Sequence, residues 1–343
     1  MKKTLFNTAL FSLLSLIIMA QDIHFSNMDF SPMTLNPGLA GAQHEVSASM
    51  IYRSQWNSIN TPFTTIGAGA DMKIAGGGQK NGTFAGGINF YNDRAGDNVI
   101  STNNVALSAA YHLKINDNST VGLGMQAGFI QRSLDAASGM WGSQYDGLAY
   151  DPTISSGETF GNPSFGRMDV GAGVVYTMGT SEKNMRANDG MRLSAGYAVY
   201  HINRPSYSFF NSEDDPLYMR HAAFANASFG ISNTTMFIDP AIYFQMQGPS
   251  MEILLGTDYK VLLTDGSKVT GNIKNSFVSM GAYYRVGDAI IPRVIYNYSD
   301  FSLGMSYDFN VSSLSQVTRT RGGMEIFFRW QMNSPIGKTK SRI

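Results

Sequence analysis

Hydrophobic and polar residues alternate with a period of two along most of this chain, and most clearly in its last quarter. Apolar or aromatic residues occupy every second position of 278–286, with small or polar residues between them. The pattern resumes after Gly287-Asp288 in residues 290–298, and again in 301–309. Because successive side chains of a strand point to opposite faces, each run has one apolar face and one small or polar face. Runs separated by such short breaks predict antiparallel hairpins.

Runs of this kind recur along the chain and predict about fourteen strands, with no amphipathic helix of ordinary length. Glycine, asparagine and aspartate fill many of the breaks, as tight turns require. The predicted strands cover residues 45–53, 64–74, 83–91, 103–115, 120–131, 167–178, 191–200, 221–231, 235–244, 251–262, 277–286, 289–298, 302–310 and 323–331.

A β-sandwich would also alternate, so other features decide between a soluble sandwich and a membrane barrel. Charged residues make up only 15% of the chain, against about 25% in ordinary soluble domains. Strands of about ten residues suit a tilted bilayer crossing. Aromatic residues near strand ends suit the interfacial girdles of a barrel, as at Phe90, Tyr91, Tyr296, Tyr298, Phe309 and Trp330. We therefore predict an all-β fold, a transmembrane antiparallel β-barrel of about 14 strands over residues 45–331, in the outer membrane.

The first twenty residues predict a secretory signal peptide. Lys2 and Lys3 precede an apolar run, and Ala20 offers a small residue for cleavage. The alternative is an uncleaved N-terminal membrane anchor, although the apolar run is short for a span.

An irregular N-terminal segment, residues 21–44, follows the signal peptide and contains prolines and glycines that break regular structure. We expect it to lie in the periplasm or in the barrel lumen. Residues 332–343 are predicted to form a C-terminal tail.

Two long gaps between predicted strands, 133–166 and 201–220, would both be external loops if the barrel begins and ends in the periplasm. The expected alternation of short periplasmic turns and longer external loops is imperfect. Residues 264–276 would be a long periplasmic connection, and residues 287–288 would be a very short external one. Both long gaps are rich in aromatic residues, which commonly anchor protein interfaces. These loops could bind a partner or fold into the barrel mouth. The candidate partner-binding residues are Trp141, Tyr145, Tyr150 and Phe160 in the first loop and Tyr207, Phe209 and Phe210 in the second.

Composition excludes several kinds of chemistry. The chain has no cysteine, so thiolate catalysis, thiolate metal sites and disulfides are excluded. Lys+Arg and Asp+Glu are both 25, and this balance argues against a nucleic-acid partner. The five histidines lack metal-ligand spacing, and no nucleophile elbow or phosphate loop is present. We expect no enzyme activity and no cofactor. The enzymatic alternative is a hydrolase at the barrel rim that uses His221 and Asp214.

The start of the predicted mature chain resembles that of the PorP/SprF family of Bacteroidetes outer-membrane proteins. The resemblance lies in Gln21-Asp22-Ile23-His24-Phe25-Ser26-Asn27 and Leu35-Asn36-Pro37-Gly38-Leu39-Ala40-Gly41, where Gly38 replaces a usual alanine. It continues in Tyr52-Arg53-Ser54-Gln55-Trp56, and returns in 288–292, in 301–308 and in Gly322-Gly323-Met324-Glu325. The family-motif residues of the N-terminal half are Gln21, Asp22, His24, Phe25, Ser26, Asn36, Pro37, Gly41, Arg53 and Trp56.

The resemblance implies a barrel that works with the type IX secretion system, which serves protein export and gliding motility. Its expected partners are secretion components, a secreted adhesin-like protein held through its C-terminal sorting domain, and outer-membrane lipid. The alternative function is an outer-membrane diffusion channel or substrate-specific transporter, because a barrel of this size can leave an aqueous path. The oligomeric state is not predicted.

Two motif positions have simpler interpretations. Asn36-Pro37 could be a turn ahead of the first strand, because a residue before proline is held extended. Arg53 and Trp56 could be an interfacial pair, with the arginine reaching toward the headgroups.

Overall fold

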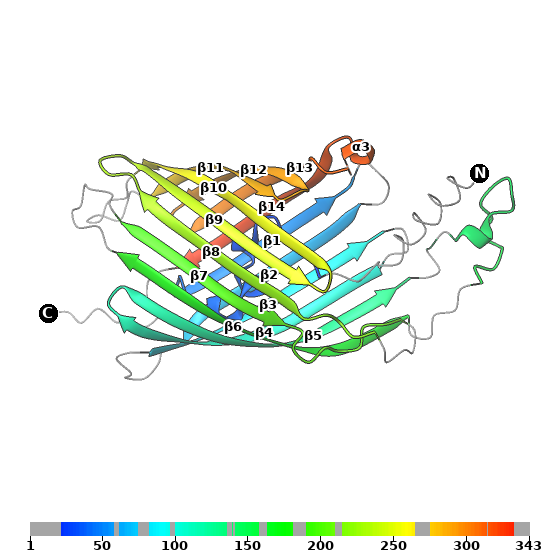
Figure 1. Ribbon diagram of the computed structural model, residues 1–343, viewed down its shortest axis with the longest axis horizontal. Helices are drawn as coiled ribbons and strands as arrows, with labels where there is room; N and C mark the ends of the chain where they lie inside the picture. The colour runs from blue at the N-terminus through cyan, green and yellow to red at the C-terminus, as the bar shows by residue number, and fades with distance from the viewer. Residues whose placement is uncertain are drawn as a thin grey trace, which may run out of the picture.

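A computed structural model of the chain shows fourteen strands that form one barrel (Figure 1). It describes residues 22–57, 62–74, 82–96, 100–135, 139, 141–157, 163–180, 190–209, 215–264, 275–313 and 315–332. The strands are β1 (Val46–Gln55), β2 (Phe63–Ile74), β3 (Gly82–Ala95), β4 (Ile100–Asn116), β5 (Ser119–Leu134), β6 (Ser164–Thr180), β7 (Met191–Tyr200), β8 (Arg220–Gly230), β9 (Met236–Gln247), β10 (Ser250–Thr264), β11 (Ser276–Arg285), β12 (Ala289–Tyr298), β13 (Phe301–Asn310) and β14 (Arg321–Met332).

Each strand pairs antiparallel with the next strand in the chain, and β1 pairs with β14 to close the barrel. The closing pair runs without a shift from Val46 opposite Met332 to Gln55 opposite Gly323. A closed barrel leaves no strand edge unpaired, which is the condition for crossing a bilayer with strands. The predicted fourteen-strand antiparallel barrel is confirmed.

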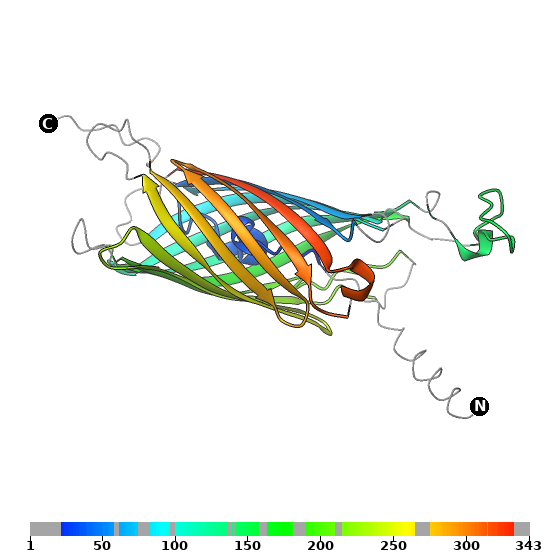
Figure 2. The ribbon, with the colours of Figure 1, turned by 90° about the horizontal axis from the view of Figure 1, so that it is seen from above.

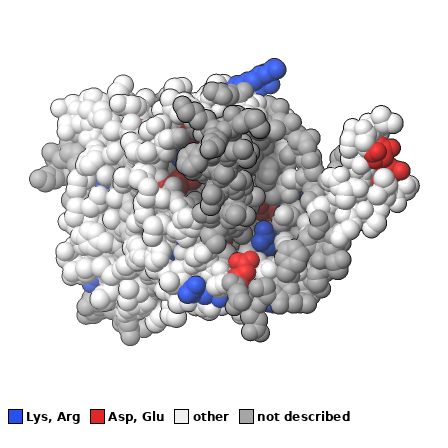
Figure 3. Space-filling model, turned by 45° about the vertical axis from the view of Figure 1, so that its right-hand side comes forward, with Lys and Arg blue, Asp and Glu red and all other residues white. Residues whose placement is uncertain are grey.

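The alternation in sequence separates an apolar outer face from an inner face that carries buried polar and charged side chains as well as apolar clusters. Leu107 and Met125, on β4 and β5, leave 62% and 67% of their surface exposed, whereas Ser306 and Asp308 on β13 are buried. Exposed large apolar side chains cover the outside of every strand, as lipid contact requires. Few charged groups lie on the face shown in Figure 3.

The two ends of the barrel differ in their connections. One end, here the long-loop end, carries the connections after the odd-numbered strands, including 135–163 and 201–219. The other, here the terminal end, carries the start of β1 and the end of β14. Residues 141–157 project beyond the barrel at the long-loop end, and contain the short helix η3 (Gly142–Gln144) (Figure 1). None of the helices in the described part of the chain is long and apolar enough to cross a bilayer.

Residues 22–44, here the lumenal segment, lie inside the barrel rather than beyond its end (Figure 2). The segment forms three short helices: η1 (Met28–Phe30), α2 (Pro32–Leu35) and η2 (Pro37–Leu39). Proline opens α2 and η2, where its fixed φ and missing N–H are tolerated. Another short helix, α3 (Ser315–Thr318), lies in the connection between β13 and β14.

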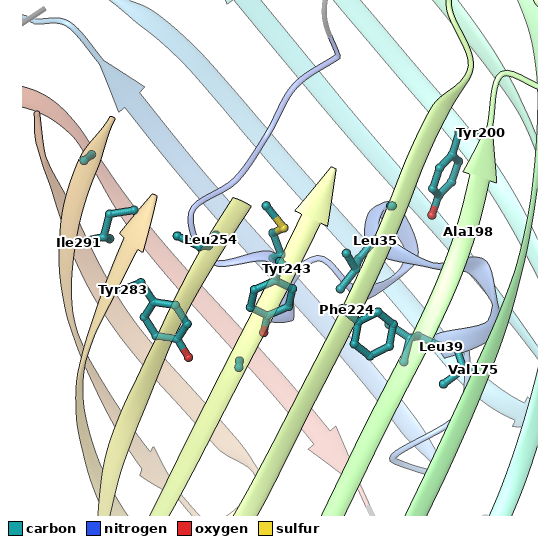
Figure 4. Close-up of a cluster of buried hydrophobic side chains, with 14 residues drawn as sticks. Leu35, Leu39, Val175, Ala198, Tyr200, Phe224, Tyr243, Leu254, Tyr283 and Ile291 are labelled. Atoms are coloured by element: carbon teal, nitrogen blue, oxygen red, sulfur yellow. The ribbon is translucent and has the colours of Figure 1, made fainter. Parts of the chain in front are cut away.

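The barrel core is built from the lumenal segment packed on the strands. Leu35 and Leu39 lie among inward side chains such as Tyr200, Phe224 and Tyr243 (Figure 4). Phe25 and Phe30 pack with Ile51 of β1, Ile295 of β12 and Phe327 of β14, and Met33 and Ala40 pack with Ala85 and Ala110. Burying one large apolar side chain contributes about 1.5–3 kcal/mol. All three buried clusters therefore depend on the segment.

Candidate functional site: the lumenal segment and its anchors

A buried carboxylate on β14 holds the start of the lumenal segment. Glu325 accepts hydrogen bonds from the backbone N–H of Ser26 at 2.6 Å and of Asn27 at 3.0 Å. Its charge is balanced by Arg53 of β1, which donates to the same carboxylate. Arg53 and Glu325 are each only 1% exposed. The alternation of β1 and β14 turns both side chains inward, because a charge on the opposite face would meet lipid.

A second carboxylate extends this cluster. Asp308 of β13 accepts from Ser26 Oγ at 2.9 Å, from Arg53 Nη2 at 3.1 Å and from Arg285 Nη1 at 3.0 Å. Two guanidinium groups thus face two carboxylates in a site closed to solvent. Removing one member of such a buried set leaves an uncompensated charge, which is strongly destabilising.

Two further arginines anchor the first helical turn of the segment. Arg293 of β12 donates to Asp29 Oδ1 at 2.9 Å and also bonds Asp258 of β10. Arg329 of β14 donates to the Asp29 carbonyl, and its guanidinium lies 4.1 Å from the centre of the Phe30 ring. Arginine suits these positions because its planar group can bond and stack at once.

The N-terminal end of the segment is held at the long-loop end by His201, which follows β7. His201 Nδ1 lies 2.8 Å from Asp169, and Nε2 lies 2.6 Å from Asp22. Arg220 Nε is 3.1 Å from the same Asp22 carboxylate. Burial lowers the pKa of His201, but the two carboxylates outweigh burial and raise this pKa to about 9. His201 is therefore a cation at neutral pH.

The pKa of Asp22 is shifted in the opposite direction to that of His201. Burial raises its pKa, but the charges of His201 and Arg220 outweigh burial and hold the pKa well below its usual range. The Asp22–His201 contact is therefore an ion pair around neutral pH, and it ties the segment to the connection after β7.

Glycines in the barrel wall make room for the segment. A Cβ at Gly124 of β5 would lie 2.2 Å from the Gly38 nitrogen, and one at Gly173 of β6 would lie 2.3 Å from Asn36 Oδ1. Asn36 is fully buried, accepts from the Gly38 N–H at 2.8 Å and donates to the Val174 carbonyl at 3.1 Å. Only glycine allows the wall and the segment to approach this closely.

The segment ends at a turn that also needs glycine. Gly41 has φ +64°, and its N–H donates to Asp71 of β2 at 2.7 Å. His112 Nε2 of β4 lies 2.7 Å from the Ala40 carbonyl. Contacts to strands on opposite sides of the barrel thus fix both ends of the segment and its middle.

Among the described residues, one cavity lies toward each end of the lumen. The smaller, about 200 Å³, lies at the long-loop end between Asp22, His24, strands β8 to β11 and the turn after β11. The larger, about 840 Å³, opens at the terminal end, and the segment forms its floor with side chains from Asp29 to His44. Among the described residues the two share no lining side chain. The segment therefore separates them.

Residues 17–330 match the family described as Type IX secretion system membrane protein PorP/SprF. The chain belongs to the PorP/SprF family. It is therefore an outer-membrane β-barrel associated with type IX secretion. No curated protein matches the chain.

Among solved structures, this PorP/SprF chain is similar to other outer-membrane barrels. A TodX monoaromatic hydrocarbon channel mutant has a TM-score of 0.46 and 8% identity, over 89% of this chain and 94% of that one. BamA from Haemophilus ducreyi lacking POTRA domains 1-3 has a TM-score of 0.44 and 7% identity, over 84% and 70%. A Pseudomonas aeruginosa FadL homologue has a TM-score of 0.42 and 8% identity, over 84% and 89%. TM-scores this low carry no argument about function.

The family motifs from the two ends of the sequence meet in the lumen. One bonded cluster contains Ser26 of the first motif, Arg53 of the motif Tyr52–Trp56, and Asp308 and Glu325 of the last two motifs. Of the other motif residues, Asp22, Phe25, Asn36, Pro37 and Gly41 contact the barrel wall or pack in its core, and His24 lies near Glu252. Gln21 lies outside the described residues. The motifs that carry the resemblance are thus largely the residues that seat the segment.

The interpretation of Arg53 as an interfacial arginine is wrong. Its side chain points into the lumen and is paired with two carboxylates, because Arg53 shares the inward face of β1 with Ile51. Trp56 is half-buried at the long-loop end, with φ 56°, and packs edge-on against Phe63 with ring centres 4.8 Å apart. The two residues do not act as a pair.

The predicted loop residues fall into two structural settings. Tyr145 and Tyr150 form a bridge in the projecting loop and are exposed, and Trp141 lies at the base of η3. Tyr207 and Phe209 instead pack against Phe165 at the barrel mouth, where the Arg132 guanidinium lies over both rings. Phe160 and Phe210 lie outside the described residues. Tyr145 and Tyr150 are thus exposed in the projecting loop, whereas the described part of the second loop is folded onto the barrel.

Proposed function

We propose that this barrel is a closed scaffold of the type IX secretion system that helps to export or anchor one secreted, adhesin-like protein. The partner would be recognised through its C-terminal sorting domain at the long-loop end, which we assign to the cell exterior. The mechanism is binding, and needs no catalysis and no cofactor.

The seated lumenal segment is the observation that supports this proposal most strongly. A transport channel needs a continuous aqueous path, whereas here buried ion pairs and a fitted glycine wall hold a plug across the lumen. A barrel whose lumen is closed by so many buried charged groups is better suited to bind a partner at its surface than to pass a solute.

The projecting loop supplies a surface of the right kind. Leu148 is 91% exposed at its tip, beside the exposed Tyr145. Isolated exposed apolar groups are ordinary, but an aromatic and an aliphatic side chain carried away from the barrel on one loop suit a protein interface. Asp146 and Asp151 shape this loop by accepting backbone N–H groups.

Affinity purification from native outer membrane tests the proposal. We expect a large secreted protein, or type IX secretion components, to co-purify with the wild-type barrel. The double variant Tyr145→Ser, Leu148→Ser should lose most of this partner, because removing interface anchors costs more than about 1 kcal/mol each. The matched control Val317→Ser changes an exposed apolar residue of α3, at the same end, and should retain it. Purification of the wild-type barrel with no secretion component or secreted protein bound would overturn the proposal.

The second candidate function is a diffusion channel, favoured by the 840 Å³ cavity at the terminal end. Its wall is polar and charged, with Lys260 and Asp239 paired at 3.2 Å and only partly buried. This candidate requires the lumenal segment to leave its seat, and ion conductance distinguishes it from the scaffold.

A further inference from the structure

The 200 Å³ cavity at the long-loop end is lined by two buried polar atoms without hydrogen-bond partners. Glu252 Oε1 and Arg285 Nε are both buried and, within the described residues, form no hydrogen bond. Arg285 Nε lies 3.6 Å from the other oxygen of Glu252, which is beyond hydrogen-bond length. Only 6% of the Arg285 side chain is exposed. One carboxyl oxygen and one N–H group thus remain open in the same small space.

The cavity lies at the mouth of the barrel, between the lumenal segment and the wall. Asp22 and His24 of the segment line one side, and β8 to β11 with the turn after β11 line the other. The side chains of His24 and Asp288 each leave 35% of their surface exposed. A side chain of a partner bound at the long-loop end can therefore reach the cavity.

The charged groups around the cavity already have partners of opposite charge. The His201 cation lies 2.6 Å from Asp22. Arg285 Nη1 lies 3.1 Å from Asp288, and the same guanidinium faces Glu252. An added cation would be repelled by His201 and Arg285, and an added anion would be repelled by the carboxylates. The cavity therefore suits a ligand without net charge.

A primary amide is a neutral group that matches both open atoms. Its carbonyl oxygen can accept from the Arg285 N–H, and its NH₂ group can donate to the Glu252 oxygen. The volume agrees with one side chain, because a cavity of about 150 Å³ holds a benzene molecule. An asparagine or glutamine side chain would fill much of the 200 Å³, whereas a serine hydroxyl would leave most of it unfilled.

We propose that this cavity, here the amide socket, receives the side-chain amide of an asparagine or glutamine on the protein that binds at the long-loop end. The amide oxygen accepts from Arg285 Nε, and the amide NH₂ donates to Glu252 Oε1. The inference rests on the proposed function, because it takes the partner to be a protein bound at the long-loop end.

A side chain in the amide socket would also help to hold the lumenal segment. The segment and the wall line the same cavity, so one inserted side chain contacts both. The Asp22 N–H already donates to Gln247 Oε1 of the wall at 2.8 Å beside this space. A ligand that binds one state better than another stabilises that state. The partner would therefore favour the plugged barrel over one whose segment has left its seat.

Filling the amide socket tests the proposal through recovery of the partner from native outer membrane. Ser250 lines the cavity and follows the tight turn between β9 and β10. In Ser250→Phe the larger side chain occupies the space, so we expect at least about fivefold less partner than with the wild type, as for the loss of one interface anchor. Ser250→Ala is the matched control, because it removes the hydroxyl without filling the cavity, and should retain the partner. Equal recovery with the two variants would overturn the proposal.

A second measurement needs neither the partner nor a variant, and so holds even where Ser250→Phe fails to fold. Saturation-transfer NMR of the purified wild-type barrel in a non-ionic detergent compares propionamide, propionate and propylammonium, which are similar in size and differ in charge. We expect the strongest transfer to propionamide, and loss of this preference in a folded Ser250→Phe barrel. Equal transfer to the three probes, or stronger transfer to either ion, would overturn the amide socket.

The two measurements separate this inference from the proposed function. A wild-type barrel that prefers propionamide but co-purifies with no partner would support the amide chemistry and overturn the proposed function. A partner that binds Ser250→Phe as well as the wild type would overturn the amide socket alone.

Discussion

At the scale of single residues, the notable feature is a set of charges buried inside a membrane protein. Arg53, Asp308 and Glu325 are each at most 2% exposed, yet each is paired. Moving ions from water into the protein interior costs more free energy than their mutual attraction recovers, unless every ion is paired and hydrogen-bonded. Such clusters therefore specify the arrangement of the chain more than they add to its stability. Here the arrangement specified is the position of Ser26 and Asn27 in the lumen.

Arg53→Ala is expected to release the lumenal segment. The change leaves the Glu325 and Asp308 carboxylates with less compensation, which costs about 3–5 kcal/mol for a buried pair. Hydrogen exchange of residues 26–40 should accelerate by two orders of magnitude or more. Lys73→Ala is the control, since its partly exposed pair with Glu45 contributes at most about 1 kcal/mol. Unchanged exchange in Arg53→Ala would show that the cluster does not hold the segment.

The His201 anchor is expected to weaken in alkali. Its folded pKa of about 9 exceeds the ordinary value of 6.5, so its contribution is complete below pH 6.5 and disappears as pH rises through 9. The shift corresponds to roughly 3 kcal/mol. The folded pKa of Asp22 is lowered rather than raised, so the contribution of Asp22 to the stability of the fold is lost only at acidic pH.

Thermal unfolding between pH 7 and pH 10 measures this effect. The wild-type melting temperature should fall more steeply with pH than that of His201→Gln, which has no titrating group at this position. His221→Gln should follow the wild type, because His221 lies on the outer face of β8, bonded to Tyr197. Parallel curves for wild type and His201→Gln would exclude His201 as the group responsible.

At the scale of elements, the lumenal segment and the strands are matched to each other. Three helices too short to be stable alone are held by a wall whose glycines leave room for them. The segment in turn packs against β5 and β6 and fills the lumen beside them. Neither part has a complete core without the other.

Gly124→Ala is expected to unseat the segment at η2. The new Cβ would lie 2.2 Å from the Gly38 backbone, which cannot yield as a flexible side chain would. Overpacking of this kind costs about 1–3 kcal/mol. Limited chymotrypsin digestion should then cut at Leu35 and Leu39 faster than in the wild type. Gly86→Ala is the matched control, with its nearest atom, Ile74 Cδ1, at an ordinary 3.5 Å. Equal digestion of both variants would contradict the fit described here.

The strands were predictable from sequence because lipid outside and polar groups inside impose a strict alternation. All fourteen predicted runs overlap the observed strands, and 191–200 and 289–298 agree at both ends. The length of β4 was underestimated, since its ends extend past the apolar stretch to Ile100 and Asn116.

The anchors were only partly predictable. The same parity turns Asp258, Arg285, Arg293, Asp308 and Glu325 inward, so a charged residue in mid-strand was the available signal for them. Which of these charged residues pair depends on which strands face each other across the lumen. The alternation of apolar and polar residues carries no information about that. His201 gave no signal, because its partners Asp22 and Asp169 are distant in sequence.

At the scale of the whole molecule, the barrel is closed in two senses. Its sheet is continuous from β1 to β14, and in the described part of the chain residues 22–44 lie between two cavities of the lumen that share no lining side chain. The family places it in type IX secretion, and the plug favours a role at its surface over a role as a pore.

Ion conductance of the full-length wild-type barrel in a planar bilayer at neutral pH tests this closure most directly. A plugged scaffold should give no steady current, and Arg53→Ala should introduce opening events in the same preparation. A stable, ohmic current through the wild-type barrel would contradict the account, because ions would then be crossing a lumen that the segment is said to close.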